Sequence, residues 1–364
     1  MSRVVAKGPQ DLKKEVLDNE LCSACGACIS LCPYIDLVAG KAVIIEPCGL
    51  SEGRCYSFCP RTYLNVSLPN NDLLALPAGG HALGSHLRIV KARSMDAEIK
   101  SAAQYGGVTS ALMTYALETG EIDVAALARS WVGRTTPKPT LAKNREEVLQ
   151  CAGSKYIVCP VLTEVTEAVK SGIGIIGVVG TPCQVTAIRK MQALESEPAM
   201  DRIRIVIGLF CTWALSPEAY NYIRNLTDPS KVVKLDVPPP PANILVIETE
   251  EERIEIPLDQ IGQFIMPACN VCLDMTSEFA DISIGTVEGE ADWNTVIVRT
   301  RFGDEFLQRA REAGIVETRP LEKERVKHLC TASSNKKKRA LIEMESRKIY
   351  PLGVGDEDRS RILL

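Results

Sequence analysis

Seven of the fourteen cysteines in this 364-residue chain are concentrated near its start, and their spacing indicates redox chemistry. They are Cys22, Cys25, Cys28, Cys32, Cys48, Cys55 and Cys59. The first four form a C-x2-C-x2-C-x3-C-P run, a spacing at which thiolates hold iron–sulfur clusters. Structural zinc sites favour separate C-x2-C pairs, and buried free thiols need no spacing, so both are weaker interpretations.

This run has the spacing of bacterial ferredoxins, in which three thiolates hold one cubane and the fourth ligates a second cluster. The short gaps allow a tight loop to aim three sulfurs at one cubane, with Gly26 giving backbone amides room to approach. We therefore expect residues 1–72 to form a ferredoxin-like module that carries single electrons.

The second half of the module is irregular, because Cys48 is followed only by Cys55 and by Cys59-Pro60. A regular ferredoxin pattern would have one more cysteine. The second site therefore recruits a cysteine from elsewhere, uses a non-cysteine ligand such as Ser51 or Glu52, or holds a three-iron cluster. The sequence alone leaves these alternatives open.

Composition sets the broad class of the protein. A hydrophobic content of 46% and a length of 364 residues predict a soluble globular chain of two or three domains. A net charge of -4 argues against a nucleic-acid partner. No apolar stretch suits a signal peptide or a membrane span, which favours a cytoplasmic location and cluster chemistry over disulfides. We read residues 336–339, Lys-Lys-Lys-Arg, as the solvated face of a helix or a surface that steers an acidic partner.

Alternating strands and helices follow a Pro- and Gly-rich linker at residues 73–86. Strands are predicted at 87–93, 122–130, 173–180 and 203–211, with helices at 107–118, 185–194 and 217–226. This rhythm predicts an α/β domain over 87–237. A β-rich part is expected over 238–330, with strands at 244–248, 253–256, 282–285 and 295–298, and a helix and tail over 331–364. The fold class is thus α/β in the second domain and α+β overall.

Four further cysteines follow predicted strands or form a pair. Cys183 and Cys211 come just after two buried strands, and Cys269 and Cys272 form a C-x2-C pair. Ligands bind at the carboxyl ends of strands in α/β sheets, so these four thiols could hold one more cluster. The alternative is that Cys183 and Cys211 are ordinary buried thiols. We interpret the remaining cysteines, Cys151, Cys159 and Cys330, as structural.

A flavin site is weakly indicated by Gln104-Tyr-Gly-Gly-Val-Thr-Ser110 at the start of a predicted helix. Glycines permit close backbone approach, and a helix N-terminus favours a phosphate. A glycine pair before a helix is more often simple packing, and the sequence has no Rossmann or P-loop motif.

Together these motifs resemble the beta-subunit family of coenzyme F420 hydrogenase and dehydrogenase. The resemblance also rests on Gly153-Ser-Lys-Tyr156, Gly180-Thr-Pro-Cys183-Gln184, Gly208-Leu-Phe-Cys211, Ala280-Asp-Ile-Ser-Ile-Gly285 and Trp293-Asn-Thr-Val-Ile-Val-Arg299. It extends in order over nearly the whole chain.

The resemblance implies FAD in the α/β domain, coenzyme F420 as the hydride-carrying substrate, and a 4Fe-4S cluster near the flavin. Carried over by motif, the cluster ligands are Cys183, Cys211, Cys269 and Cys272. The implied flavin neighbours are Gln104, Gly106, Gly107, Thr109, Ser110, Lys155, Tyr156, Asn294 and Thr295. No general base is needed for hydride exchange. Lys155, Arg189 and Arg299 are candidates for contacts with the acidic tail of the coenzyme.

A flavin can exchange hydride with one partner and single electrons with another. Coenzyme F420 and iron–sulfur clusters together require both kinds of exchange. The expected activity is hydride exchange between F420 and FAD, with electrons passed through two or three clusters. The acceptor would be another subunit of a hydrogenase, formate dehydrogenase or heterodisulfide-reductase type of complex, or soluble ferredoxin. Two alternatives remain: an electron-relay scaffold without active flavin, and the same machinery using NAD(P)H or an organic substrate.

Overall fold

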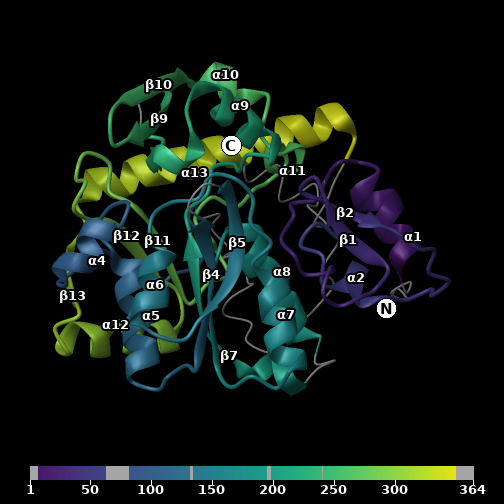
Figure 1. Ribbon diagram of the computed structural model, residues 1–364. Helices are drawn as coiled ribbons and strands as arrows, with labels where there is room; N and C mark the ends of the chain where they lie inside the picture. The colour runs from purple at the N-terminus through teal and green to yellow at the C-terminus, as the bar shows by residue number, and fades with distance from the viewer. Residues whose placement is uncertain (1–6, 63–81, 132–133, 195–197, 240, 350–364) are drawn as a thin grey trace.

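A computed structural model describes residues 7–62, 82–131, 134–194, 198–239 and 241–349. Its N-terminal part is a small cysteine-rich module, drawn in purple in Figure 1. The module contains α1 (Pro9–Leu12), a π-helical turn η1 (Lys13–Leu17), the antiparallel hairpin β1 (Ile35–Val38) and β2 (Lys41–Ile44), and α2 (Arg54–Ser57).

An eight-stranded mixed sheet forms the centre of the molecule, in the order β13-β3-β12-β11-β7-β6-β4-β5. Strands β4, β6, β7 and β11 run parallel, and the flanking strands pair antiparallel. The strands are β3 (Arg88–Ser94), β4 (Val124–Trp131), β5 (Arg134–Ala142), β6 (Ile176–Gly180), β7 (Ile203–Leu209), β11 (Ile282–Thr286), β12 (Asn294–Val298) and β13 (Val316–Pro320).

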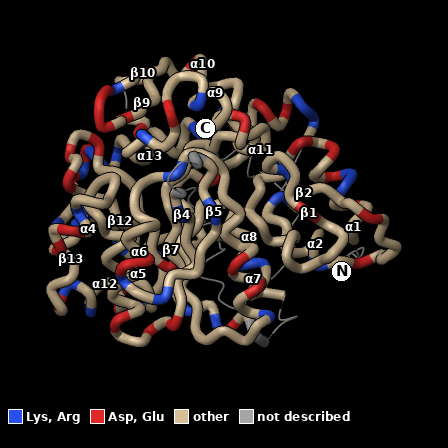
Figure 2. The backbone as a smooth tube through the Cα atoms, viewed as in Figure 1, with Lys and Arg blue, Asp and Glu red and all other residues tan. Residues whose placement is uncertain are grey.

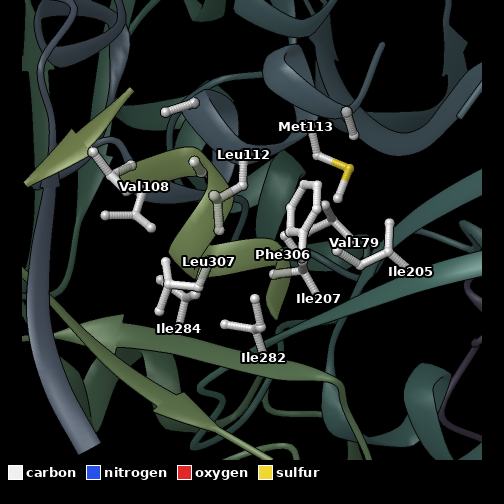
Figure 3. Packing of buried hydrophobic residues seen from close by; sticks show 14 of the residues in the cluster. Val108, Leu112, Met113, Val179, Ile205, Ile207, Ile282, Ile284, Phe306 and Leu307 are labelled. Carbon is white, nitrogen blue, oxygen red and sulfur yellow. The ribbon is translucent and has the colours of Figure 1, made fainter. Parts of the chain in front are cut away.

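Helices cover both faces of this sheet. Successive residues of each central strand point to opposite faces, so each strand contributes side chains to two cores. On β4, Ala125 and Leu127 face α5 (Val108–Glu118), α6 (Arg145–Gln150) and α12 (Arg301–Glu312). Val124 and Ala126 face α7 (Leu162–Lys170) and α8 (Pro182–Ala193). Figure 3 shows the first of these cores, where side chains of α5 and α12 pack on β6, β7 and β11. Short α4 (Ala97–Ala102) follows β3.

A second, three-stranded sheet lies apart from the first in the order β10-β9-β8. It consists of β8 (Val232–Asp236), β9 (Ile244–Thr249) and β10 (Arg253–Pro257), with α9 (Glu218–Leu226) and α10 (Leu258–Gly262) packed in the same core. Short helical turns η2 (Pro198–Arg202), η3 (Pro229–Lys231) and α11 (Pro267–Asn270) complete the connections.

The long helix α13 (Lys323–Arg347) links the parts of the molecule. It crosses from the sheet domain to the cysteine-rich module in Figure 1. Leu341 and Met344 near its end share a core with Leu12, Ile35 and Tyr56 of the module. No helix in the described ranges is long and apolar enough to cross a membrane.

The sequence predicted the α/β class, and the fold confirms that class. Strands β1, β2, β5, β8 and β13 and helices α6 and α7 were not predicted. Two expectations were wrong. Strands β11 and β12 were expected in a separate β-rich part, but they lie inside the large sheet, between β7 and β3. The C-terminal helix begins at Lys323 and not at residue 331. Much of the expected linker at 73–86 lies outside the described residues.

The charges are spread over the surface, with Lys and Arg interspersed with Asp and Glu along the outer helices in Figure 2. The basic run on α13 is an exception to the solvated face we expected. Lys336 is only 3% exposed, and Lys337 forms an ion pair with Glu278 in a nearly buried position. The interpretation of this run as a solvated surface was therefore wrong for these two lysines.

Candidate cofactor and metal site

A cavity of about 710 Å³ opens where parallel strands β6 and β7 end. Its volume lies within the range of small-molecule and cofactor pockets, roughly 300–1,000 Å³. Apolar side chains of the sheet and of α5, such as Met113, Leu127 and Val179, line one side. The α13 residues Arg325, Lys336 and Arg339 line another. The cavity therefore lies at the sheet edge where α/β folds bind ligands.

The four cysteines predicted to form a second group all line this cavity. Cys183 lies in the first turn of α8, which begins with Pro182 and is capped by a reciprocal Thr181–Gln184 contact. Cys211 follows β7, and its amide donates to the Met275 carbonyl at 2.9 Å. The structure thus brings residues from three distant segments to one wall.

The remaining pair comes from α11 and the loop after it. The Cys269 sulfur accepts the amide of Ala214 at 3.4 Å, and the Cys272 thiol contacts the Asp274 carbonyl at 3.5 Å. Burial raises the pKa of the Cys211 thiol, with Cys269, Cys183 and Cys272 adding to the effect. These four thiols are therefore close enough to act on one another electrostatically. We call them the proximal cysteines.

Two buried cations act on the proximal cysteines, and the sequence analysis missed both. Arg61 is 5% exposed and comes from the end of the cysteine-rich module. Burial alone would lower its pKa, but Cys272, Cys183 and Cys269 outweigh burial and raise it. Burial alone would raise the pKa of the Cys272 thiol, but the positive charges of Lys336 and Arg61 outweigh burial and lower it. No sequence signal marked Arg61, because its role depends on how the two parts dock.

The seven N-terminal cysteines fall into two groups that follow the ferredoxin pattern. Burial raises the pKa of the Cys28 thiol, with further contributions from Cys25, Cys59 and Cys22. Burial also raises the pKa of Cys55 to about 11, and there the neighbours are Cys32 and Cys48. The first group thus combines three cysteines of the first run with Cys59. The second combines Cys32 with Cys48 and Cys55.

The first N-terminal group lies beside the proximal cysteines. Burial raises the pKa of Cys25, and the next largest contributions come from Cys183 and Cys59. Among the described residues, no three Cys, His, Asp or Glu side chains converge tightly enough to hold a single metal ion. Ligands of a cubane surround a four-iron core and stand further apart than the ligands of a single ion.

Seven of the nine residues predicted near a flavin line the same cavity: Gln104, Thr109, Ser110, Lys155, Tyr156, Asn294 and Thr295. Several also tie the cavity wall together. Asn294 Oδ1 accepts the amide of Val108 at the start of α5 at 3.2 Å, and its Nδ2 donates to the Gly285 carbonyl. Gln104 donates to the Leu235 carbonyl at 3.2 Å. The polar wall is thus held in place before any ligand binds.

Lys155 is the basic residue of this group. Its ammonium group contacts the carbonyls of Cys151, Ala152 and Gly153 at the end of α6. Burial lowers its pKa to about 8, although Cys151 and Cys159 act in the opposite direction. With a pKa of about 8, Lys155 is mostly charged near pH 7 and can pair with an anionic ligand group.

The glycines of the motif have a different role from the one expected. Gly106 and Gly107 do not line the cavity. A Cβ atom at Gly106 would lie 2.9 Å from the amide of Asn294. Gly107 has a φ of +74° and packs against Ile99 and Ser94. Gly106 thus packs against the start of β12 and Gly107 against β3 and α4, so both glycines serve the packing around the start of α5.

Gly26 likewise serves packing. Its φ is +93°, and a Cβ atom there would lie 2.7 Å from the Pro160 carbonyl oxygen and 2.9 Å from the amide of Thr163. This glycine lets the first cysteine loop dock closely on the start of α7. We expected Gly26 to make room for cluster amides, and this close packing is a further role.

Two of the three basic residues suggested for an acidic coenzyme tail are occupied elsewhere. Arg299 is 5% exposed and donates to the carbonyls of Leu83, Ser85 and Thr276. Arg189 pairs with Asp281 at 3.0 Å. Neither lines the cavity, so these two suggestions were wrong, whereas Lys155 does line it. Cys151 and Cys159, interpreted as structural, also belong to the cavity wall.

Comparison with known proteins identifies relatives of the sheet domain. Residues 89–165 match the N-terminal part of the coenzyme F420 hydrogenase/dehydrogenase beta-subunit family, and residues 174–324 match the C-terminal part of the same family. Both matches begin after the cysteine-rich module.

Individual relatives agree with this match. The chain is 34% identical over 250 residues to coenzyme F420 hydrogenase subunit beta of Methanosarcina barkeri, covering 66% of this chain and 84% of the relative. It is 33% identical over 279 residues to coenzyme F420 hydrogenase subunit beta of Methanothermobacter thermautotrophicus, covering 73% and 96%. A solved chain of the F420-reducing [NiFe] hydrogenase complex from Methanosarcina barkeri superposes with a TM-score of 0.68 at 33% identity, covering 73% of this chain and 94% of that one.

Proposed function

Since this chain belongs to the coenzyme F420 hydrogenase/dehydrogenase beta-subunit family, we propose that it exchanges hydride between coenzyme F420 and FAD and passes single electrons through iron–sulfur clusters. Its family makes it an F420-linked redox subunit, and relatives belong to multisubunit complexes. The observation that carries the finer proposal is one cavity lined both by the predicted flavin residues and by the four proximal cysteines.

The cavity wall fits a flavin dinucleotide. The first turn of α5 lies at the cavity, with the hydroxyl-bearing residues Thr109 and Ser110, and a helix N-terminus favours phosphate groups. Apolar residues including Val108, Met113 and Leu127 provide a wall for an aromatic ring system. Lys155 adds a positive charge at the same wall. When bound, FAD would supply the exchange between two-electron hydride and one-electron chemistry.

The cysteine groups fit a path for electrons. Cys183 of the proximal group raises the pKa of Cys25 in the first N-terminal group. Cys55 of the second N-terminal group raises the pKa of Cys28 in the first. The three groups are thus adjacent in series from the cavity through the ferredoxin-like module. All-thiolate sets of this kind hold 4Fe-4S clusters, and we assign one cluster to each group. Ser51 or Glu52 remains the candidate fourth ligand of the second N-terminal group if that cluster has four irons.

Other subunits of a redox complex or a ferredoxin are the proposed electron acceptors. The second N-terminal group comes last in the series that begins at the cavity, and two of its three thiols, those of Cys32 and Cys48, are partly exposed. Electrons can leave most easily where a cluster lies near the surface. We therefore place the exit to the partner at this end of the module.

Stopped-flow reduction of anaerobically purified protein tests the hydride step. The flavin absorbance is followed after mixing with F420H2, NADH or NADPH in parallel, with a viologen as the final acceptor. Rapid bleaching by F420H2 supports the proposal. Bleaching by a nicotinamide alone would replace the coenzyme and keep the mechanism. Protein that carries no flavin, or flavin that none of the three donors reduces, would favour an electron relay or an organic substrate.

A further inference from the structure

The proximal cysteines are accompanied by two buried cations that come from opposite ends of the chain. Arg61 follows the last cysteine of the ferredoxin-like module, and Lys336 lies in the middle of α13. They are 5% and 3% exposed. Both line the cavity beside Cys183, Cys211, Cys269 and Cys272. Fully buried arginine and lysine are rare unless they have an anionic or hydrogen-bonding partner, so their placement calls for a reason.

The direct partners of these cations leave much of their charge uncompensated. Lys336 Nζ donates to the carbonyls of Cys211 at 2.6 Å and Asp274 at 2.7 Å. The nearby Asp274 carboxylate is itself bonded to the amides of Ser277 and Glu278. Nε of Arg61 has no hydrogen-bond partner among the described residues. The largest favourable electrostatic contributions to both cations come from the cysteines.

Arg61 also lies at the border between two cysteine groups. It acts on Cys59 of the module as well as on the proximal cysteines. At Cys59, however, the charge of Lys190 lowers the pKa of the thiol more than the charge of Arg61 does. Each group thus has a buried cation supplied by the other part of the molecule: Lys190 from α8 for the module, and Arg61 from the module for the proximal group, where Lys336 has the larger effect on Cys272.

A cluster bound by four thiolates is anionic, and taking up one electron adds a further negative charge. In a buried site this charge is poorly screened by solvent. A fixed positive charge beside it favours the reduced form over the oxidised form and raises the reduction potential. Net charge and hydrogen bonds to the sulfurs are among the factors that set cluster potentials.

We propose that Arg61 and Lys336 are positioning residues that raise the reduction potential of the cluster held by the proximal cysteines, and that Arg61 makes this potential depend on a docked ferredoxin-like module. The inference rests on the cluster assignment of the proposed function. Its consequence is that the proximal cluster accepts an electron readily only when the module that receives the electron next is in place. The cluster passes between its oxidised and its one-electron-reduced form, and the electron comes from the reduced flavin or from an added reductant.

The test is an EPR-monitored redox titration of the full chain, purified without oxygen. The proximal signal is identified as the one that Cys183→Ser removes. At the potential where half of the wild-type proximal cluster is reduced, we expect Arg61→Gln to lower the ratio of reduced to oxidised cluster at least tenfold. A tenfold change corresponds to about 59 mV for a one-electron couple. The module signals should shift less, because Lys190 remains beside Cys59.

Two variants separate charge from packing. Arg61→Lys keeps the charge and should restore most of the wild-type ratio. Arg54→Gln removes an exposed arginine from the same module and should leave the ratio unchanged, which controls for net charge. Lys336→Gln should lower the ratio in the same direction, and it carries the test if Arg61→Gln fails to assemble its clusters.

An unchanged potential in Arg61→Gln and Lys336→Gln, with iron content and spectra intact, would overturn the inference. So would a fall in Arg61→Lys as large as in Arg61→Gln, because the effect would then come from packing. Failure of the cluster assignment itself looks different. In that case wild-type protein lacks the third cluster by iron assay, and Cys183→Ser removes no signal.

Discussion

The ammonium group of Lys190 in α8 lies 2.7 Å from the hydroxyl of Thr62, at the end of the ferredoxin-like module. The same group donates to the carbonyls of Cys59 at 2.5 Å and Thr62 at 3.2 Å. Lys190 is only 1% exposed. Burial lowers its pKa to about 8, against the opposing effect of Cys59 and Cys25. One buried lysine of the sheet domain thus holds the last turn of the module.

We predict that Lys190→Met loosens the module without unfolding the sheet domain. The variant removes three hydrogen bonds, those to the Thr62 hydroxyl and to the Thr62 and Cys59 carbonyls. A hydrogen bond from a charged donor contributes about 1.5–3 kcal/mol. Hydrogen exchange of residues 54–62 should become faster, and a chelator should remove module iron sooner.

Lys170→Met is the matched control for this prediction. Lys170 also reaches a module carbonyl, that of Ser30, but from an exposed position on α7. Its removal should change exchange little, because exposed interactions contribute little to stability. Equal exchange in the Lys190→Met variant and in wild type would contradict a clamping role for Lys190.

Metal content provides a second prediction. Three cubanes require about twelve iron atoms per chain, and about eleven are expected if the second module site holds a three-iron cluster. Cys183→Ser should lower the count by about four, because a proximal ligand is lost. Iron and acid-labile sulfide assays on anaerobically purified protein measure this. A wild-type value near four, or zinc in place of iron, would contradict the three-cluster assignment.

The sequence predicted those parts of the site that depend on local spacing or on strand ends. Cys183 and Cys211 follow neighbouring parallel strands β6 and β7, and the topology brings such positions together. The spacing of the first cysteine run was by itself sufficient to predict a ferredoxin-like module. Buried strands such as β6 and β7 are continuous apolar runs, which explains why their limits were nearly correct.

Features that depend on docking between distant segments could not be predicted in this way. The basic run of α13 looks like a solvated helix face, yet Lys336 is buried because α13 packs across the proximal cysteines. Arg61 has no motif around it, and its role follows from the fit of the module against the sheet domain. Strands β11 and β12 looked like part of a separate unit because the chain visits the small sheet before returning to the large one.

A third prediction concerns Gly107, whose φ of +74° is unfavourable for other residues. Gly107→Ala should destabilise the protein, by about 1–2 kcal/mol from the backbone conformation and by more from contacts of the new methyl group with Ile99 and Ser94. The loss should appear in protein without flavin, because Gly107 does not line the cavity. Thermal unfolding of flavin-free protein measures it.

Gly120→Ala separates the two contributions to this loss. Gly120 has a similar φ of +70° at the end of α5, but no atom lies within 4 Å of a Cβ atom placed there. This variant should lose only the conformational part. Equal losses in the two variants would show that the packing around Gly107 relaxes. A flavin-dependent loss at Gly107 would return this glycine to the ligand site.

The last prediction concerns pH and Lys155. Burial lowers the pKa of Lys155 to about 8, so this side chain is charged near pH 7 and largely neutral near pH 9. A bound FAD carries phosphate anions, which favour the charged lysine and raise its pKa. Flavin binding above pH 8 must therefore take up a proton, and affinity must fall as the pH rises through 8. We expect the Kd for FAD to increase roughly tenfold between about pH 7 and pH 9. Most of this increase falls between about pH 8 and pH 9, where binding takes up one proton.

Fluorescence titration of flavin-depleted protein measures this change in Kd. Lys155→Met should bind more weakly at pH 7 and lose the pH dependence, whereas Lys143→Met, which removes an exposed lysine outside the cavity, should keep it. A pH dependence that survives in Lys155→Met would assign the titrating group to another residue.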